Sequence, residues 1–358
     1  MHPQVREITH SQPGGEPGGR SDSQAAGQPG DQPRPWSPPL RPEDFRWEIP
    51  ERFNIGAACT DAHPPEAPAI VVDRGDAPPE ITTFGQLGER ARRLVTFLRE
   101  RGVGEGDRIA VMCAQSAETA VAHVAAYLMG AIAVPLSVKF GPEAALFRMG
   151  DSGAVAAVFD ADCYARLAGE LAGLPELHTM LVTGDAVPEA TSPVAGAMHA
   201  TGTAPAVDDS ALTVLPLAVA EEADLAVVTP DTGPDDPALL IYTSGTTGQP
   251  KGALHGHRVV LGHMPGVVRA LDGFPGGAAG QGSAAGDSAA AGESTDVFWT
   301  PADWAWAGGL LDVLLPSLYS GVVRQPGITG VRRAGSAFRP CGGSNSRDLS
   351  GSRPRSSG

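Results

Sequence analysis

A short run of hydroxyl-bearing residues and glycines, closed by a lysine, is the segment of this chain whose composition points most clearly to chemistry. It follows the apolar residues 239–242 and reads Thr-Ser-Gly-Thr-Thr-Gly-Gln-Pro-Lys-Gly over residues 243–252. Glycine permits backbone dihedrals that turn successive N–H groups inward, and such a concave backbone binds anions. The hydroxyl groups add donors, and the ammonium group of Lys251 adds a positive charge. The run therefore predicts a binding loop for a polyphosphate.

The spacing of this loop differs from that of the Walker P-loop, because its glycines are Gly245 and Gly248 and Gly252 follows the lysine. The chain has only two lysines, Lys139 and Lys251, against 24 arginines. An ammonium group is a compact point charge that suits a phosphate, so we interpret Lys251 as a functional residue. A plain turn rich in Gly, Ser and Thr after a strand is the alternative interpretation.

Residues 242–252 resemble the signature segment of the adenylate-forming enzymes, which include AMP-forming acyl-CoA synthetases, luciferases and the adenylation domains of peptide synthetases. The resemblance extends on both sides and covers residues 45–324. Within it, residues 239–321 are most similar to acetyl-CoA and medium-chain acyl-CoA synthetases. The other stretches that carry the resemblance are residues 82–111, 126–153 and 296–309.

The resemblance implies a two-step reaction that uses ATP, Mg²⁺ and coenzyme A. A carboxylate and ATP give an acyl-adenylate and pyrophosphate, and coenzyme A then displaces AMP to form a thioester. The implied acids run from acetate to medium-chain fatty acids, which would place the chain in fatty acid metabolism. The loop and Mg²⁺ would offset the charge of the departing pyrophosphate. The implied phosphate-binding residues are Thr243, Ser244, Gly245, Thr246, Thr247, Gly248 and Lys251.

Two tryptophans, Trp304 and Trp306, lie in the resembling segment that follows the loop. Trp306 matches the family's tryptophan near the acyl and pantetheine channel. The resemblance therefore implies that these two side chains line the acyl/CoA channel, while packing in the core explains them equally well.

Short apolar strands alternate with helical patterns, which predicts an α/β fold with a mostly parallel sheet covered by helices. Thr83 and Gln86 form a capping box at the start of one helix, and Ser116 caps the next. The resemblance implies an incomplete large N-terminal domain of the adenylate-forming fold. The predicted strands are residues 70–72, 109–113, 132–136, 154–159, 179–182 and 238–242, and a further helix is predicted at 165–172.

Segments rich in Gly, Pro, Ser and Ala cannot bury enough apolar surface to offset the entropy of ordering. On this basis residues 1–44 are predicted to be disordered, and residues 276–292 to be a flexible insertion. Residues 325–358 are predicted to be a disordered basic tail, with six arginines and one aspartate after residue 330. The acidic residues 184–237 are predicted to be a long irregular connection, and residues 45–324 to be a partial AMP-binding domain.

The resemblance to the family stops at residue 324. We find no later aromatic-Thr-Glu motif, no aspartate for the ribose and no Pro-Lys-x-x-x-Gly-Lys segment, so the small C-terminal domain is expected to be absent and no catalytic residue is assigned. A truncated ligase with little or no activity alone is the expectation. Two alternatives stay open: a catalytically incompetent module that binds a nucleotide or a partner, and an adenylation domain like those of peptide synthetases.

Composition limits the other classes of function. The net charge of −15 argues against a general nucleic-acid binder, and no apolar run reaches the ~20 residues of a membrane-spanning helix. Four scattered cysteines form neither a disulfide framework nor a zinc site, which favours a cytoplasmic protein. His255, His257 and His263 lack the i, i+4 spacing of a helical zinc site, so no metal site is predicted.

Overall fold

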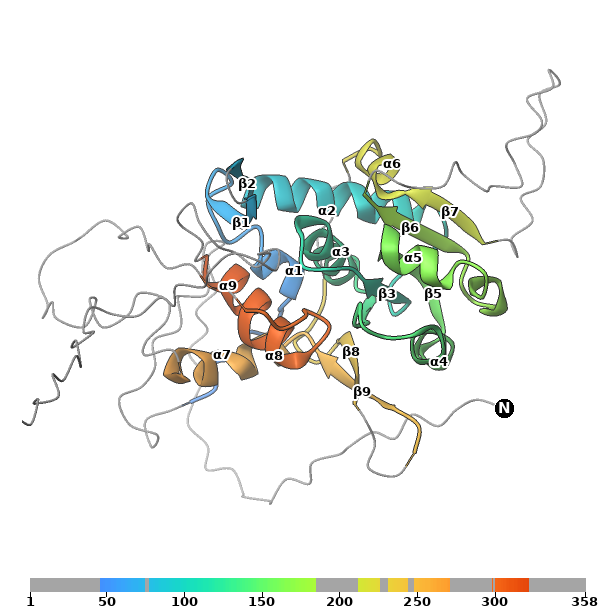
Figure 1. The fold of residues 1–358 in the computed structure, drawn as a ribbon. Helices are drawn as coiled ribbons and strands as arrows, with labels where there is room; N and C mark the ends of the chain where they lie inside the picture. Colours follow the sequence, from blue (N-terminus) through green and yellow to red (C-terminus); the bar gives the residue numbers. More distant parts are fainter. Residues whose placement is uncertain are drawn as a thin grey trace, which may run out of the picture. The chain divides into compact units, whose positions relative to one another are not determined.

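The computed structural model describes residues 46–74, 77–184, 212–225, 231–243, 248–270, 298 and 300–321, which all belong to one compact unit (Figure 1). The expected disordered ends, 1–44 and 325–358, and the expected insertion, 276–292, lie outside these residues. Those three expectations therefore stay predictions.

A seven-stranded, mostly parallel sheet forms the centre of the unit, with the strand order β7-β6-β5-β3-β4-β8-β9 (Figure 1). Every neighbouring pair from β7 to β8 is parallel, whereas β9 runs antiparallel to β8. A separate antiparallel pair consists of β1 (Pro68–Arg74) and β2 (Ala77–Thr83). The strands of the large sheet are β3 (Arg108–Met112), β4 (Ile132–Pro135), β5 (Ala154–Asp160), β6 (Thr179–Thr183), β7 (Thr213–Pro216), β8 (Pro237–Thr243) and β9 (Lys251–Gly256).

Two helices begin where the sequence predicted caps. At the start of α2 (Phe84–Arg99), the Thr83 hydroxyl accepts from the Gln86 N–H at 3.2 Å, and the Gln86 Oε1 accepts from the Thr83 N–H at 2.9 Å. At the start of α3 (Ala117–Leu128), the Ser116 hydroxyl accepts from the Thr119 N–H at 3.3 Å. The other helices are α1 (Ile55–Ala58), α4 (Pro142–Ser152), α5 (Ala161–Leu167), α6 (Leu217–Glu221), α7 (Val259–Ala270), α8 (Ala307–Gly309) and α9 (Leu315–Ser320), with a 3₁₀-helix η2 (Leu171–Gly173) and a π-helix η4 (Leu310–Leu314).

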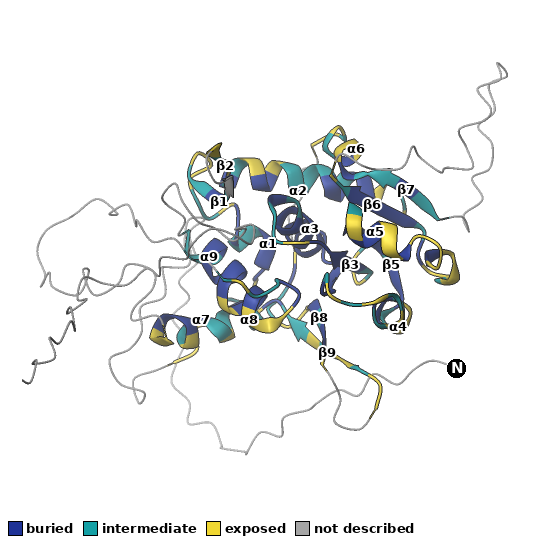
Figure 2. Cartoon of the chain, in the orientation of Figure 1, coloured by how far each residue is buried: buried dark blue, intermediate teal, exposed yellow. Residues whose placement is uncertain are grey.

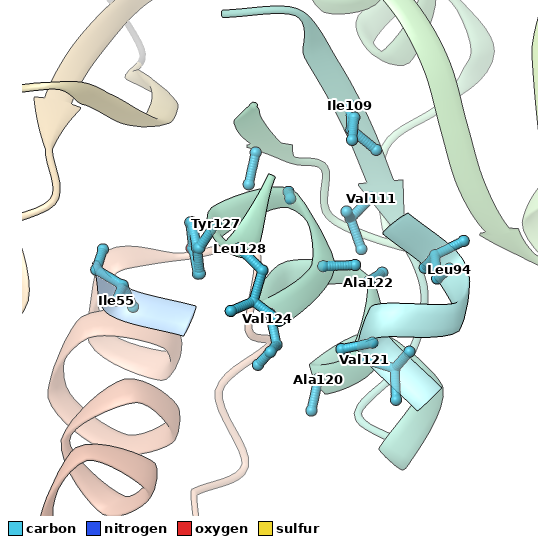
Figure 3. Close-up of a cluster of buried hydrophobic side chains, with 14 of the residues drawn as sticks. Ile55, Leu94, Ile109, Val111, Ala120, Val121, Ala122, Val124, Tyr127 and Leu128 are labelled. Atoms are coloured by element: carbon cyan, nitrogen blue, oxygen red, sulfur yellow. The ribbon is translucent and has the colours of Figure 1, made fainter. Parts of the chain in front are cut away.

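Helices cover both faces of the sheet, because both faces are apolar. Along β3, Ile109 and Val111 belong to the core cluster that includes α2 and α3, whereas Ala110 and Met112 belong to the cluster that includes α4 and α5. Successive side chains of a strand point to opposite faces, so a strand with no polar alternation needs cover on both. Figure 2 shows the buried strands and α3 between helices with exposed outer faces. Figure 3 shows the first cluster, with Ile55, Leu94, Ile109, Val111, Val121, Val124 and Leu128.

Two predicted elements need correction. Residues 184–237 are not irregular throughout, because their described part contains β7 and α6, and Leu217 of α6 is buried. A four-residue strand carries too little periodicity to recognise, and its pairing with β6 defines it. The helix predicted at 165–172 begins earlier, at Ala161, because the Asp160 side chain accepts from the Cys163 N–H at 2.8 Å and caps it. It ends at Leu167.

Candidate functional site

The predicted phosphate loop leaves the sheet at the carboxyl end of β8 and returns as β9. Thr243 and Lys251 are opposite each other in the β8–β9 register, and the Thr243 hydroxyl donates to the Lys251 carbonyl oxygen at 3.4 Å. Both residues are exposed, and Gly248 has φ +146°, a conformation that favours glycine. Residues 244–247 lie outside the described part of the chain. The structure thus brings Thr243, Gly248 and Lys251 to one end of the sheet, and their contacts with phosphate stay a prediction.

The end of strand β8, just before the loop, is held against α4. The Tyr242 hydroxyl donates to Asp151 Oδ2 at 2.6 Å. Burial and, after it, the hydrogen bond to Asp151 raise the pKa of the Tyr242 hydroxyl, so it stays a donor at neutral pH. The guanidinium carbon of Arg148 lies 4.2 Å from the centre of the Phe140 ring and 5.8 Å from that of Tyr242. A cation between two rings stabilises this packing, which holds the end of β8 in place.

A second segment, residues 300–306, reaches the carboxyl ends of the neighbouring strands β3 and β4. The Gln115 amide, which follows β3, donates to the carbonyl oxygen of Thr300 at 3.2 Å and to that of Ala302. The Ser137 hydroxyl, which follows β4, donates to Asp303 Oδ2 at 2.8 Å. Parallel strands end at one edge of a sheet, where ligands of open α/β folds bind. Segment 300–306 and the root of the phosphate loop therefore share the edge expected for a ligand.

The two candidate tryptophans differ in their surroundings. Trp304 is buried, with 8% of its surface exposed, and packs in the larger core cluster. Trp306 is 44% exposed, and its ring meets the Phe140 ring edge to face with centroids 5.7 Å apart. Trp304 therefore occupies a core position, and Trp306 presents an indole surface at the carboxyl edge of the sheet.

The other lysine, Lys139, lies in the turn after β4 and is exposed. Its backbone N–H donates to the Ser137 hydroxyl at 3.2 Å. Sequence reasoning did not identify Ser137, Gln115 or Asp303 as important. Asp303 lies in the segment that carries the family resemblance, which is a signal for it, but Ser137 and Gln115 look like ordinary loop residues until their partners are known.

The three histidines that follow the loop are held by different parts of the fold. His257 Nδ1 accepts from the Ile55 N–H at 3.1 Å, and burial lowers the pKa of His257 to about 4. His263 Nδ1 lies 2.8 Å from Asp312 Oδ1. Burial, and then the charge of His263, lower the pKa of His255. The contact with Ile55 gives His257 a packing role, whereas the pair with Asp312 joins His263 of α7 to η4.

In the part of the chain that the structure describes, no three His, Cys, Asp or Glu residues lie close enough together to hold a metal ion. Mg²⁺ that arrives on ATP keeps phosphate oxygens and waters as its main ligands and needs few from the protein. The Thr243 hydroxyl is an oxygen of the kind that Mg²⁺ accepts, so the loop is compatible with ATP bound as its magnesium complex.

None of the helices described here combines the length and the apolar character that crossing a lipid bilayer would require.

Comparison with known proteins identifies the family. The profile of the family described as "AMP-binding enzyme" matches residues 58–324. A 3-hydroxybenzoate–CoA/4-hydroxybenzoate–CoA ligase of Thauera aromatica is 34% identical over 182 residues, which cover 50% of this chain and 30% of that ligase. An acetyl-coenzyme A synthetase of Sodalis glossinidius is 29% identical over 272 residues, which cover 74% of this chain and 38% of that synthetase. The chain thus spans about a third of the length of these curated relatives.

The solved structures agree with the predicted fold. An acyl-CoA synthetase of Brucella canis matches with a TM-score of 0.56 at 22% sequence identity, over 77% of this chain and 43% of that protein. The expected likeness to acyl-CoA synthetases is confirmed, and ligases of aromatic acids join the relatives. The chain therefore belongs to the AMP-binding enzyme family, and its sequence is similar to those of ligases that join acyl or aryl acids to coenzyme A.

Proposed function

We propose that this chain provides the ATP-phosphate-binding part of an AMP-forming ligase that joins a carboxylic acid to coenzyme A. The observation that carries the proposal is the hydroxyl-and-glycine loop rooted at the carboxyl end of β8, with Lys251 opposite Thr243. ATP binds there through its β- and γ-phosphates. The carboxylate oxygen attacks the α-phosphorus, pyrophosphate leaves, and coenzyme A then displaces AMP from the acyl-adenylate.

The roles of the loop residues follow from charge. The departing pyrophosphate gathers negative charge, and donors fixed in advance stabilise it without reorganising. Backbone N–H groups and hydroxyls of residues 243–248 supply neutral donors, and Lys251 supplies a full positive charge. Mg²⁺ bound to the phosphates supplies further charge neutralisation.

We propose carboxylates from acetate to medium-chain fatty acids as the substrates. Support comes from the resemblance of residues 239–321 to synthetases for these acids. Because one relative is a ligase of hydroxybenzoates, aromatic acids are the competing substrates against which these aliphatic acids are compared.

Calorimetric titration with MgATP tests the phosphate site. We expect saturable binding to the full chain and at least ten-fold weaker binding to Lys251→Ala, since one charge-assisted contact contributes about 1.5 kcal/mol or more. Arg99→Ala removes a positive charge from the exposed end of α2, away from the carboxyl edge of the sheet, and is the control, with less than a two-fold change. Equal affinity for ATP in Lys251→Ala and the unsubstituted chain would refute the assignment.

Pyrophosphate release tests the chemistry. The full chain is incubated with MgATP and acetate, hexanoate, decanoate or 3-hydroxybenzoate, and release is followed with and without coenzyme A. Faster release with the aliphatic acids supports the proposed substrates, and faster release with 3-hydroxybenzoate overturns them. ATP binding with no release for any acid favours the second candidate, a nucleotide-binding module without ligase chemistry.

A further inference from the structure

Segment 300–306 is anchored at its start by the chain that follows β3. The Gln115 side chain donates to two carbonyl oxygens of the segment, those of Thr300 and Ala302. Gln115 and these partners lie more than 180 residues apart in the sequence. This anchor fixes where the segment enters the edge of the sheet, but it does not fix the orientation of the residues that follow.

The carboxylate of Asp303 fixes that orientation. Its Oδ2 accepts from the Ser137 hydroxyl at 2.8 Å and from the Val138 N–H at 3.2 Å, and its Oδ1 accepts from the Ala305 N–H at 3.0 Å. One side chain thus joins the turn after β4 to the turn that leads into Trp306. Hydrogen bonds to a charged acceptor are stronger than those to neutral groups, so this bridge is a firm link between the two turns.

The backbone of Asp303 also supports Trp306. The Trp306 N–H donates to the Asp303 carbonyl oxygen at 3.1 Å, which closes the turn. Gly309, at the end of α8, approaches so closely that an added Cβ would overlap the same carbonyl oxygen. The Asp303 carbonyl oxygen is thus in contact with the chain at Trp306 itself and again three residues later, at Gly309.

The same turn after β4 presents the ring against which Trp306 packs. The Phe140 N–H donates to the Ser137 carbonyl oxygen at 2.9 Å, and the Phe140 ring lies edge to face with Trp306 at an interplanar angle of 80°. Arg148 stacks on the Phe140 ring at 4.2 Å. The Ser137–Asp303 contact thus ties together the two turns that carry this ring pair, at the carboxyl edge of the sheet.

We propose that Asp303 is a positioning residue, whose carboxylate holds Trp306 edge to face against Phe140 so that the two rings form a wall for the acyl and pantetheine part of the substrate. This inference rests on the proposed function and adds a residue to it. A large side chain that is held before binding loses less conformational entropy when the ligand arrives. A site also needs supporting hydrogen bonds that lock its contact residues. Asp303 supplies these bonds without needing to touch the ligand.

Fluorine NMR of the full chain, labelled with 5-fluorotryptophan, tests the positioning. The chain has five tryptophans, and Trp306→Phe identifies the Trp306 resonance. Asp303→Asn replaces a carboxylate oxygen, which accepts hydrogen bonds, by an amide NH₂ group, which cannot accept them. Ser137→Ala removes the hydroxyl that donates to Asp303 Oδ2. The scale for the shift is the difference between the Trp306 chemical shifts of the folded and the urea-unfolded unsubstituted chain. In both variants we expect the Trp306 resonance to move by more than half of this difference. Ser137→Thr keeps the hydroxyl and should restore the original position.

The control is Ser317→Ala, which removes a buried hydroxyl that has no hydrogen-bond partner in the described part of the chain. It should leave the Trp306 resonance in place. The resonance of Trp304, which is buried in the core, reports whether each variant is folded, and if Asp303→Asn unfolds, Ser137→Ala decides. A Trp306 resonance that stays within its linewidth in a folded Ser137→Ala chain would overturn the positioning role.

Titration with coenzyme A, followed on the same resonance, tests the wall. We expect coenzyme A to shift the Trp306 resonance in the unsubstituted chain. In Asp303→Asn, we expect the half-maximal shift to require at least a five-fold higher concentration of coenzyme A. If coenzyme A does not move the Trp306 resonance, the proposal that the Trp306 and Phe140 rings form a wall for the substrate is wrong. The first experiment contains no nucleotide, so a chain that fails to bind ATP refutes the proposed function while leaving the test of Asp303 valid.

Discussion

Two buried histidines should make this fold sensitive to mild acid. His123 of α3 and His257, just after β9, have 1% and 0% of their surfaces exposed. Burial lowers the pKa of each from 6.5 to about 4, with the charge of Asp236 opposing the effect at His257. The His257 Nδ1 accepts from the Ile55 N–H and loses this role when protonated. His123 Nδ1 lies 3.3 Å from the Tyr127 hydroxyl.

The direction of the effect follows from these lowered pKa values. Below pH 6.5 the unfolded chain takes up protons on both histidines, whereas the folded chain holds them neutral until about pH 4. The stabilisation that neutral histidines provide is therefore complete above pH 6.5, is lost as the pH falls, and stops changing below about 4. Each histidine lowers the free energy of unfolding by about 2 kcal/mol between pH 7 and pH 5, and by about 3.4 kcal/mol in all once the pH is well below 4. The pair costs about 4 kcal/mol at pH 5, a large part of the 5–15 kcal/mol of an ordinary domain.

Urea denaturation followed by circular dichroism at pH 7 and pH 5, at equal ionic strength, measures this loss. His257→Asn places Oδ1 near the position of Nδ1, and His123→Leu removes the other titrating ring. Each variant should lose about 2 kcal/mol less than the unsubstituted chain over this pH range. Thr232→Val, which removes a buried hydroxyl that donates to the Phe53 carbonyl oxygen, controls for destabilisation without titration. Equal pH dependence in all four chains would refute the reasoning.

Two further substitutions test the framework of the site. In Gly256→Ala, the Cβ would lie 2.8 Å from the Pro234 carbonyl oxygen, so we expect a loss of about 1–3 kcal/mol and a lower melting temperature. Gly262→Ala in α7, where an added Cβ meets nothing within 4 Å, is the control and should be neutral or stabilising; a lower melting temperature for both would contradict the steric argument. In Tyr242→Phe, loss of the 2.6 Å bond to Asp151 should cost about 1–2 kcal/mol in urea denaturation. An unchanged denaturation midpoint would show that this bond contributes nothing.

Local patterns predicted much of the fold. The Thr83–Gln86 capping box and the Ser116 cap lie where the structure has them, because a cap depends on residues within about four positions. The apolar runs of β3 and β5 predicted buried parallel strands for a similar reason. The short β7 escaped prediction, because four residues carry too little pattern and its pairing with β6 makes it a strand.

The sequence by itself determined the composition of the phosphate loop, its place after an apolar strand and the α/β alternation, since each is a property of neighbouring residues. Only the tertiary structure decided which side chains support the site. Ser137 and Asp303 are 166 positions apart and meet because β4 ends at the edge that segment 300–306 crosses. Trp304 and Trp306 are two positions apart, yet packing buries the first and exposes the second. Such contacts depend on how distant elements pack, and no local pattern encodes that packing.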